Sequence, residues 1–141
     1  MKKVLALNLG LAALLLIPMA ASGADSFLIA VASDDVEATS LVGSFPARSR
    51  YFLLFSGTDF VQVISNPFLS GGSEAASLVV DYLAQKGVGV VVAERFGPLM
   101  IQAINRKGMK YIQFSGAAKE AAEQVVISLR PPKKEEKMGT Q

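Results

Sequence analysis

Short apolar runs separated by polar turns divide most of this chain into regular elements. Near-continuous apolar runs of this length, rich in β-branched and aromatic residues, are typical of strands. Five such runs lie at 26–33, 51–55, 60–64, 88–93 and 109–114. Apolar residues recur at helical spacing elsewhere, which predicts helices at 73–87, 99–107 and 117–129. Ser73 is the expected N-cap of the first helix and Pro98 suits the first turn of the second.

The order of these elements predicts how the strands pair. They read strand–strand–strand–helix–strand–helix–strand–helix. The turn at 56–59 joins the second and third strands into an antiparallel hairpin. Helices between the later strands require parallel pairing with right-handed crossovers. The run at 88–93, VGVVVA, is typical of a strand buried on both faces. The sequence therefore predicts an α/β fold with a mixed five-stranded sheet flanked by helices.

The first two dozen residues have the pattern of a secretory signal peptide. Lys2 and Lys3 precede an apolar run that ends in small residues. Ser22 and Ala24 fit the small-x-small rule, so we expect cleavage after Ala24, with cleavage after Ser22 as the alternative. The sequence predicts a periplasmic or secreted protein with no stable membrane insertion after cleavage. The expected parts are a signal peptide at 1–24, an α/β domain at 25–130 and a disordered charged tail at 131–141.

Composition narrows the chemistry of the mature protein. The chain has no Cys and no His, which excludes disulfides, thiolate-bound clusters and Cys or His nucleophiles. No catalytic motif stands out, so we expect a non-enzyme without side-chain metal ligands. The whole chain has 14 basic and 12 acidic residues, and removal of Lys2 and Lys3 leaves 12 of each. A neutral chain without a basic stripe is not expected to bind nucleic acid.

Loops that follow the strands are the expected binding site, because ligands of open α/β sheets lie beyond the carboxyl ends of strands. Glycines before a helix offer backbone N–H groups to an anion, although they also simply permit a turn. Arginines in these loops donate several hydrogen bonds to an anion, although each is equally compatible with a solvated or ion-paired surface residue. The candidate residues are Ser33, Phe45, Arg48, Arg50, Gly71, Gly72, Arg95, Phe96 and Gly97.

Several blocks in sequence order carry a resemblance to a known family. They are F-x-A-R-x-x-Y-F at 45–52, N-P-x-x-x-G-G at 66–72, KGVGVVVAERFGP at 86–98 and KGMKYIQFSG at 107–116. Together they resemble the dinitrogenase iron–molybdenum cofactor biosynthesis family. That family includes nitrogenase cofactor carriers and a molybdenum–copper orange protein. The resemblance implies a ribonuclease-H-like fold and the binding or carriage of metal–sulfur clusters.

One departure from the family motif changes the expected binding mode. Ser44 stands where His is common, and Pro46 and Arg50 replace Gly and Pro. With the signal-peptide pattern supplying export, the resemblance then implies an exported binding protein for a metal–sulfur cluster or a related oxo- or thio-anion containing Mo, Fe or Cu. Arginines and backbone N–H groups would hold this ligand non-covalently. The alternative is a ligand-free structural protein of the cell envelope that associates with itself or a partner through its hairpin edge.

Overall fold

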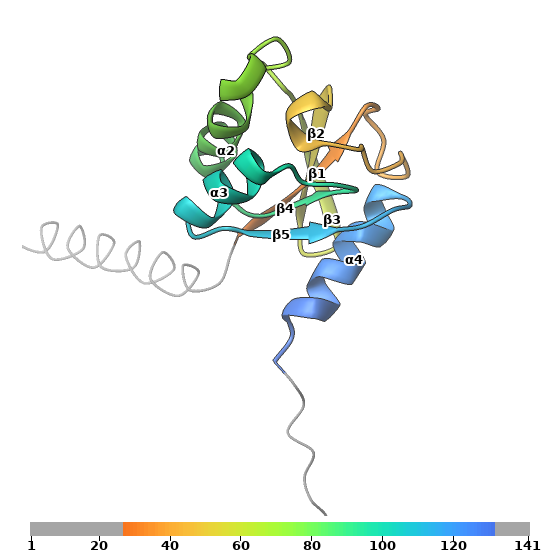
Figure 1. Ribbon diagram of the computed structural model, residues 1–141. Coiled ribbons are helices and arrows are strands. Elements are labelled where there is room, and N and C mark those ends of the chain that lie inside the picture. The colour runs from red at the N-terminus through yellow and green to blue at the C-terminus, as the bar shows by residue number, and fades with distance from the viewer. Residues whose placement is uncertain (1–26, 132–141) are drawn as a thin grey trace, which may run out of the picture.

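A computed structural model describes residues 27–131 of the chain (Figure 1). The predicted signal peptide, and the predicted tail from residue 132 onward, lie outside the described residues. The five strands are β1 (Leu28–Ser33), β2 (Tyr51–Ser56), β3 (Asp59–Ser65), β4 (Val88–Ala93) and β5 (Lys110–Gln113). The helices are α2 (Ala75–Gln85), α3 (Pro98–Arg106) and α4 (Ala118–Leu129), and two 3₁₀ turns are η1 (Pro46–Arg48) and η2 (Gly72–Glu74).

The strands form one mixed sheet in the order β3-β2-β1-β4-β5. β2 pairs antiparallel with β1 and with β3. β4 pairs parallel with β1 and with β5. α2 connects β3 to β4 and α3 connects β4 to β5, and β3 runs in the same direction as β1 because each is antiparallel to β2. The predicted α/β fold with a mixed five-stranded sheet is therefore confirmed, and so is the β2–β3 hairpin.

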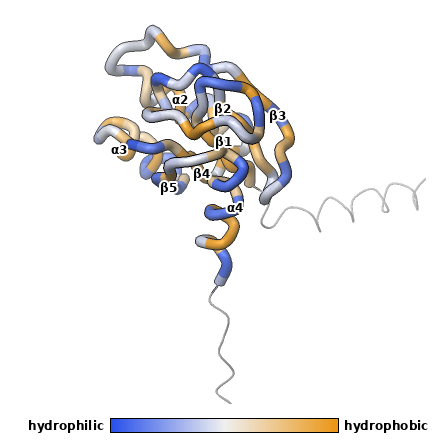
Figure 2. Tube along the Cα trace, turned by 90° about the vertical axis from the view of Figure 1, so that its right-hand side faces the viewer, coloured by the Kyte–Doolittle hydropathy of each residue, from blue (hydrophilic) through white to orange (hydrophobic). Residues whose placement is uncertain are grey.

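Helices cover both faces of this sheet and divide the core into two clusters (Figures 1 and 2). On one face α2 and α3 contribute Val79, Val80, Leu83, Met100 and Ile104. On the other face α4 contributes Ala118, Ala121, Ala122 and Val125. Small residues on α4 let this helix lie close to the sheet. Among residues 27–131 no helix has the length and apolar character to cross a membrane.

The start of α2 differs from the expectation. Ser73 is not an N-cap: it lies inside η2, and α2 begins at Ala75 with Glu74 as its N-cap and no side-chain capping bond. The reason is that a 3₁₀ turn leads directly into the helix, with the N–H of Ala75 donating to the carbonyl of Gly72. Pro98, in contrast, opens α3 as predicted.

Candidate functional site

A short crossing segment, residues 41–44, lies over the carboxyl end of the sheet. The N–H of Gly43 donates to the carbonyl of Ala32 at 2.7 Å, at the end of β1. On its other side the carbonyls of Gly43 and Ser44 accept from the N–H groups of Glu94 and Arg95, at 3.0 and 2.8 Å. The chain itself therefore satisfies backbone groups at the ends of β1 and β4, where α/β proteins commonly bind ligands.

Gly43 allows this crossing because a side chain at that position would clash with the Oγ of Ser49. That hydroxyl is buried and donates to the carbonyl of Phe45 at 2.8 Å. We expect Gly43→Ala to lower the free energy of unfolding by about 1–3 kcal/mol, because it overpacks the site or breaks this buried bond.

The control for this prediction is Gly97→Ala, at a glycine with open space around its Cβ position. This variant is expected to change the free energy of unfolding by less than about 1 kcal/mol, because the lower entropy of the unfolded state is opposed by the poorer N-cap that alanine makes for α3. Urea unfolding followed by circular dichroism measures both. Equal losses in the two variants would contradict the role given to Gly43.

Asn66 holds η1 in place from the end of the hairpin. Its side chain is 5% exposed, and its Nδ2 donates to the carbonyls of Ala47 and Ser49 at 3.1 and 2.9 Å. Its Oδ1 accepts from the N–H of Phe68 at 2.9 Å. All these polar groups are satisfied, so η1 is tied to the end of β3 by side-chain bonds rather than by sheet pairing.

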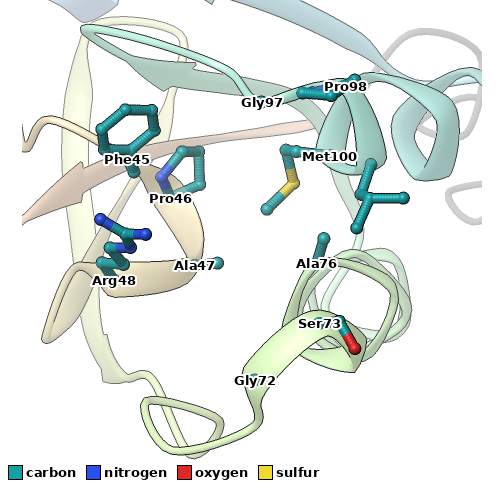
Figure 3. A pocket seen from close by; sticks show the side chains of 11 residues that line it. Phe45, Pro46, Ala47, Arg48, Gly72, Ser73, Ala76, Gly97, Pro98 and Met100 are labelled. Carbon is teal, nitrogen blue, oxygen red and sulfur yellow. The ribbon is translucent and has the colours of Figure 1, made fainter.

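A pocket of about 270 Å³ lies between η1, η2 and the beginning of α3 (Figure 3). On the η1 side, Pro46 and Ala47 lie nearest to the first turn of α3 and the start of α2, and the ring of Phe45 and the side chain of Arg48 lie farther out. Arg48 is the only charged residue that lines it. The lining residues are Phe45, Pro46, Ala47, Arg48, Gly72, Ser73, Ala76, Gly97, Pro98, Leu99 and Met100.

The electrostatic character of this pocket favours an anion. The N–H groups of Leu99 and Met100, second and third in α3, have no partner within the helix, and the helix dipole is positive at this end. The Arg48 guanidinium lies 5.4 Å from the Phe45 ring centroid. Within residues 27–131 the single salt bridge joins Lys107 and Asp81, so no carboxylate neutralises Arg48 there.

The described side chains of the protein do not provide the usual ligands for a metal ion that is coordinated directly. The chain has no Cys or His, and the described part holds no group of three or more potential Asp or Glu ligands. Met100 supplies the pocket's soft donor: its side chain is 3% exposed and its thioether points between η1 and α2 (Figure 3). These residues fit a preformed anion held by charge, N–H groups and packing.

The structure brings four of the nine candidate residues together at this pocket. Phe45 and Arg48 come from the η1 side, Gly72 from η2, and Gly97 from the N-cap of α3. Gly72 has a φ of 60°, so a glycine is favoured at that turn whether or not a ligand binds.

Two further candidates have structural roles elsewhere. The fully buried Ser33 donates from its Oγ to the carbonyl of Leu41 at 2.8 Å, and it lines a separate cavity of about 370 Å³ with Asp34 and Asp35. The N–H of Gly71 donates to the carbonyl of Phe68 at 3.0 Å, which commits it to a turn.

The remaining three candidates also lie outside the pocket lining. Arg50 is exposed beside the start of β2, where its N–H donates to Asp34 Oδ1 at 3.1 Å. Arg95 is exposed, and its N–H bonds to the crossing segment. Phe96 packs on Tyr111 of β5, with ring centroids 4.9 Å apart.

Sequence reasoning missed most of the apolar lining. Met100 and Ala76 have the helical spacing of core residues, and that pattern does not distinguish a residue facing a pocket from one facing the sheet. Pro46 and Ala47 lie in an irregular segment without a periodic signal. For the α3 side of the pocket, Pro98 was the residue in the sequence that indicated the beginning of a helix.

Together, the elements described form a small α/β domain with a pocket beside a helix N-terminus. The family model described as dinitrogenase iron-molybdenum cofactor matches residues 25–128, and the chain belongs to this family. The family is named for a metal cofactor, so the chain is a small protein of a metal-cluster-related family. No curated protein matches the chain.

Solved structures share the fold. The apo form of the orange protein from Desulfovibrio gigas has a TM-score of 0.64 at 21% identity, covering 77% of this chain and 94% of that chain. PH0822 has a TM-score of 0.60 at 21% identity, covering 72% and 92%. A Thermotoga protein named as a candidate NifB protein has a TM-score of 0.58 at 25% identity, covering 74% and 90%.

Proposed function

We propose that this protein is an exported, non-catalytic binding protein for a preformed metal–sulfur cluster or a related thio- or oxo-anion of Mo, Fe or Cu. The observation that carries the proposal is a pocket that has the N-terminus of α3 on one side and Arg48 on the other, without a lining carboxylate (Figure 3). Family membership supplies the ligand class. The orange protein structure supports it, since it is described as an apo form and shares this fold.

The size and lining of the pocket suit such a ligand. About 270 Å³ is several times the roughly 30 Å³ that one water occupies in the liquid, so a polyatomic ion fits. A largely carbon-lined wall disfavours a small, strongly hydrated ion, because few groups replace its water. Arg48 is suited to a large anion because its guanidinium is weakly hydrated and already rests on an aromatic ring.

Export is supported by the signal-peptide pattern of residues 1–24. An exported copy is separated from cytoplasmic nitrogenase assembly, so its ligand would be bound or delivered in the envelope. One preparation of the protein from the cell envelope therefore tests both the proposed localisation and the proposed ligand binding.

The test is isolation of the protein from its own envelope fraction without chelators or oxygen. We expect an intact mass that begins at Asp25, or at Gly23 for the alternative cleavage, and co-eluting Mo, Cu or Fe by elemental analysis. Full-length protein in the cytoplasm would contradict export. Mature protein without any of the three metals, and without visible absorbance, would contradict cluster binding.

A second candidate is a ligand-free structural or interaction protein of the envelope. One observation favours it: the edge strand β3 exposes backbone and apolar side chains. This candidate predicts metal-free protein in the isolation experiment together with association in solution.

A further inference from the structure

Two walls of the pocket are joined by one buried side chain that does not line the pocket itself, that of Asn66. This residue lies between β3, which ends at Ser65, and the turn that leads to η2. All of its side-chain hydrogen bonds go to the backbone. Two reach the segment that carries Arg48, and one reaches the segment that leads to Gly72. Arg48 and Gly72 lie on separate walls of the pocket (Figure 3).

The carbonyls that Asn66 binds lie directly before and after Arg48. The Nδ2 group of Asn66 donates to the carbonyl of Ala47 at 3.1 Å and to that of Ser49 at 2.9 Å, so each amide proton has one acceptor. The backbone N–H of Asn66 donates to the carbonyl of Arg50 at 2.8 Å. These three bonds hold the backbone on both sides of Arg48.

The Arg48 side chain belongs to the same turn as the ring beside it. Its guanidinium lies 5.4 Å from the ring centroid of Phe45, the N-cap residue of η1. The carbonyl of Phe45 accepts from the N–H of Arg48 at 3.2 Å and from the Oγ of Ser49 at 2.8 Å. The position of this charge relative to α3 therefore follows the position of the η1 backbone.

The remaining bond of the Asn66 side chain reaches the opposite wall. Its Oδ1 accepts from the N–H of Phe68 at 2.9 Å, which is the bond of an Asx turn. The carbonyl of Phe68 in turn accepts from the N–H of Gly71 at 3.0 Å, directly before Gly72. The Phe68 ring packs edge-on against Tyr82 of α2, with ring centroids 6.0 Å apart. One amide group therefore connects η1 to the segment that leads to η2.

We propose that Asn66 is a positioning residue for anion binding, which holds Arg48 in its place relative to the opposite wall before the anion arrives. This inference rests on the proposed function, because it concerns the same pocket. An arginine that is already held in place loses less conformational freedom on binding, which raises the affinity. The Asn66 amide is uncharged and lies outside the pocket lining, so it acts through Arg48.

The test combines substitutions of Asn66 with the loss of the Arg48 charge. Asn66→Ser keeps an oxygen that accepts a hydrogen bond but has a single proton, so it cannot donate to both carbonyls, and Asn66→Ala removes all three bonds. Each is expected to raise the dissociation constant of tetrathiomolybdate about fivefold, by anaerobic titration. In an Arg48→Met background the same changes are expected to raise it less than about twofold, because little remains for Asn66 to position.

Val125→Ala controls for a general loss of stability. Val125 is fully buried in the cluster on the other face of the sheet, so its variant is expected to keep the wild-type dissociation constant. Amide hydrogen exchange of the anion-free proteins gives a second readout. The buried Ser49 donates its N–H to the carbonyl of Pro46 within η1, and this N–H is expected to exchange about tenfold faster in the Asn66 variants than in Val125→Ala.

The outcomes separate this inference from the proposed function. Wild-type protein that binds no tetrathiomolybdate would contradict the proposed function and, with it, the role of Asn66. Wild-type binding with an unchanged dissociation constant in the Asn66 variants would overturn only that role. So would additive losses in the Arg48→Met background, an equal loss in Val125→Ala, or unchanged exchange of the Ser49 N–H. Circular dichroism checks folding, and Asn66→Ser decides if Asn66→Ala does not fold.

Discussion

Leu83→Ala is expected to lower the free energy of unfolding by about 2–5 kcal/mol. Leu83 is fully buried in the cluster between the sheet and the helices α2 and α3. Its replacement removes buried methyl groups and leaves a cavity that the surrounding sheet and helices fill only in part. The loss is a large share of the stability of a domain this size, which is about 5–15 kcal/mol. Urea unfolding followed by circular dichroism measures it.

Leu78→Ala is the matched control, because it makes the same change on the same helix at a side chain that is 37% exposed. Alanine has the higher helix propensity, so the expected change is within about 0.5 kcal/mol. If the two variants lost similar stability, the assignment of the α2 face that packs against the sheet would be wrong.

Arg48→Met is expected to weaken binding of tetrathiomolybdate about tenfold. The substitution keeps an unbranched apolar stem but removes the only charge that lines the pocket. Hydrogen bonds to charged groups contribute about 1.5–3 kcal/mol, and the lower end applies because Arg48 is exposed and screened. Anaerobic titration followed by absorbance, with and without added copper, gives the dissociation constants.

Arg106→Met controls for net charge. Arg106 is exposed at the opposite end of α3, so it loses the same charge away from the pocket. We expect its dissociation constant to stay within about twofold of wild type, because exposed charges separated by more than a Debye length of about 10 Å interact weakly. Equal weakening in both variants would assign the effect to overall charge and would contradict the proposed site.

The inner strands β1, β2 and β4 were predictable because burial on both faces of a sheet leaves a local signal. The run at 88–93 is buried except for Gly89, which is half-buried, and the hairpin turn separates two runs of the expected length. The start of α2 was not predictable from Ser73, since a suitable capping residue does not exclude a preceding 3₁₀ turn.

The site was only partly predictable because its walls are positioned by long-range bonds. Asn66 reaches across 19 residues to Ala47, and Gly43 reaches Ala32 and Glu94. These bonds place Phe45 and Arg48 at the pocket and leave Arg50 outside it. Three arginines with similar loop contexts therefore occupy different surroundings, which no local pattern of sequence distinguishes.

The crossing segment 41–44 separates the stability of the sheet from the composition of the pocket. Because the chain bonds to itself at the ends of β1 and β4, the sheet is complete without any bound molecule. The pocket walls belong to two 3₁₀ turns and the first turns of two helices, which contribute no strand pairing. Substitutions in these walls can therefore change the shape and charge of the pocket while the strand pairing is kept. The same sheet is compatible with pockets of different lining.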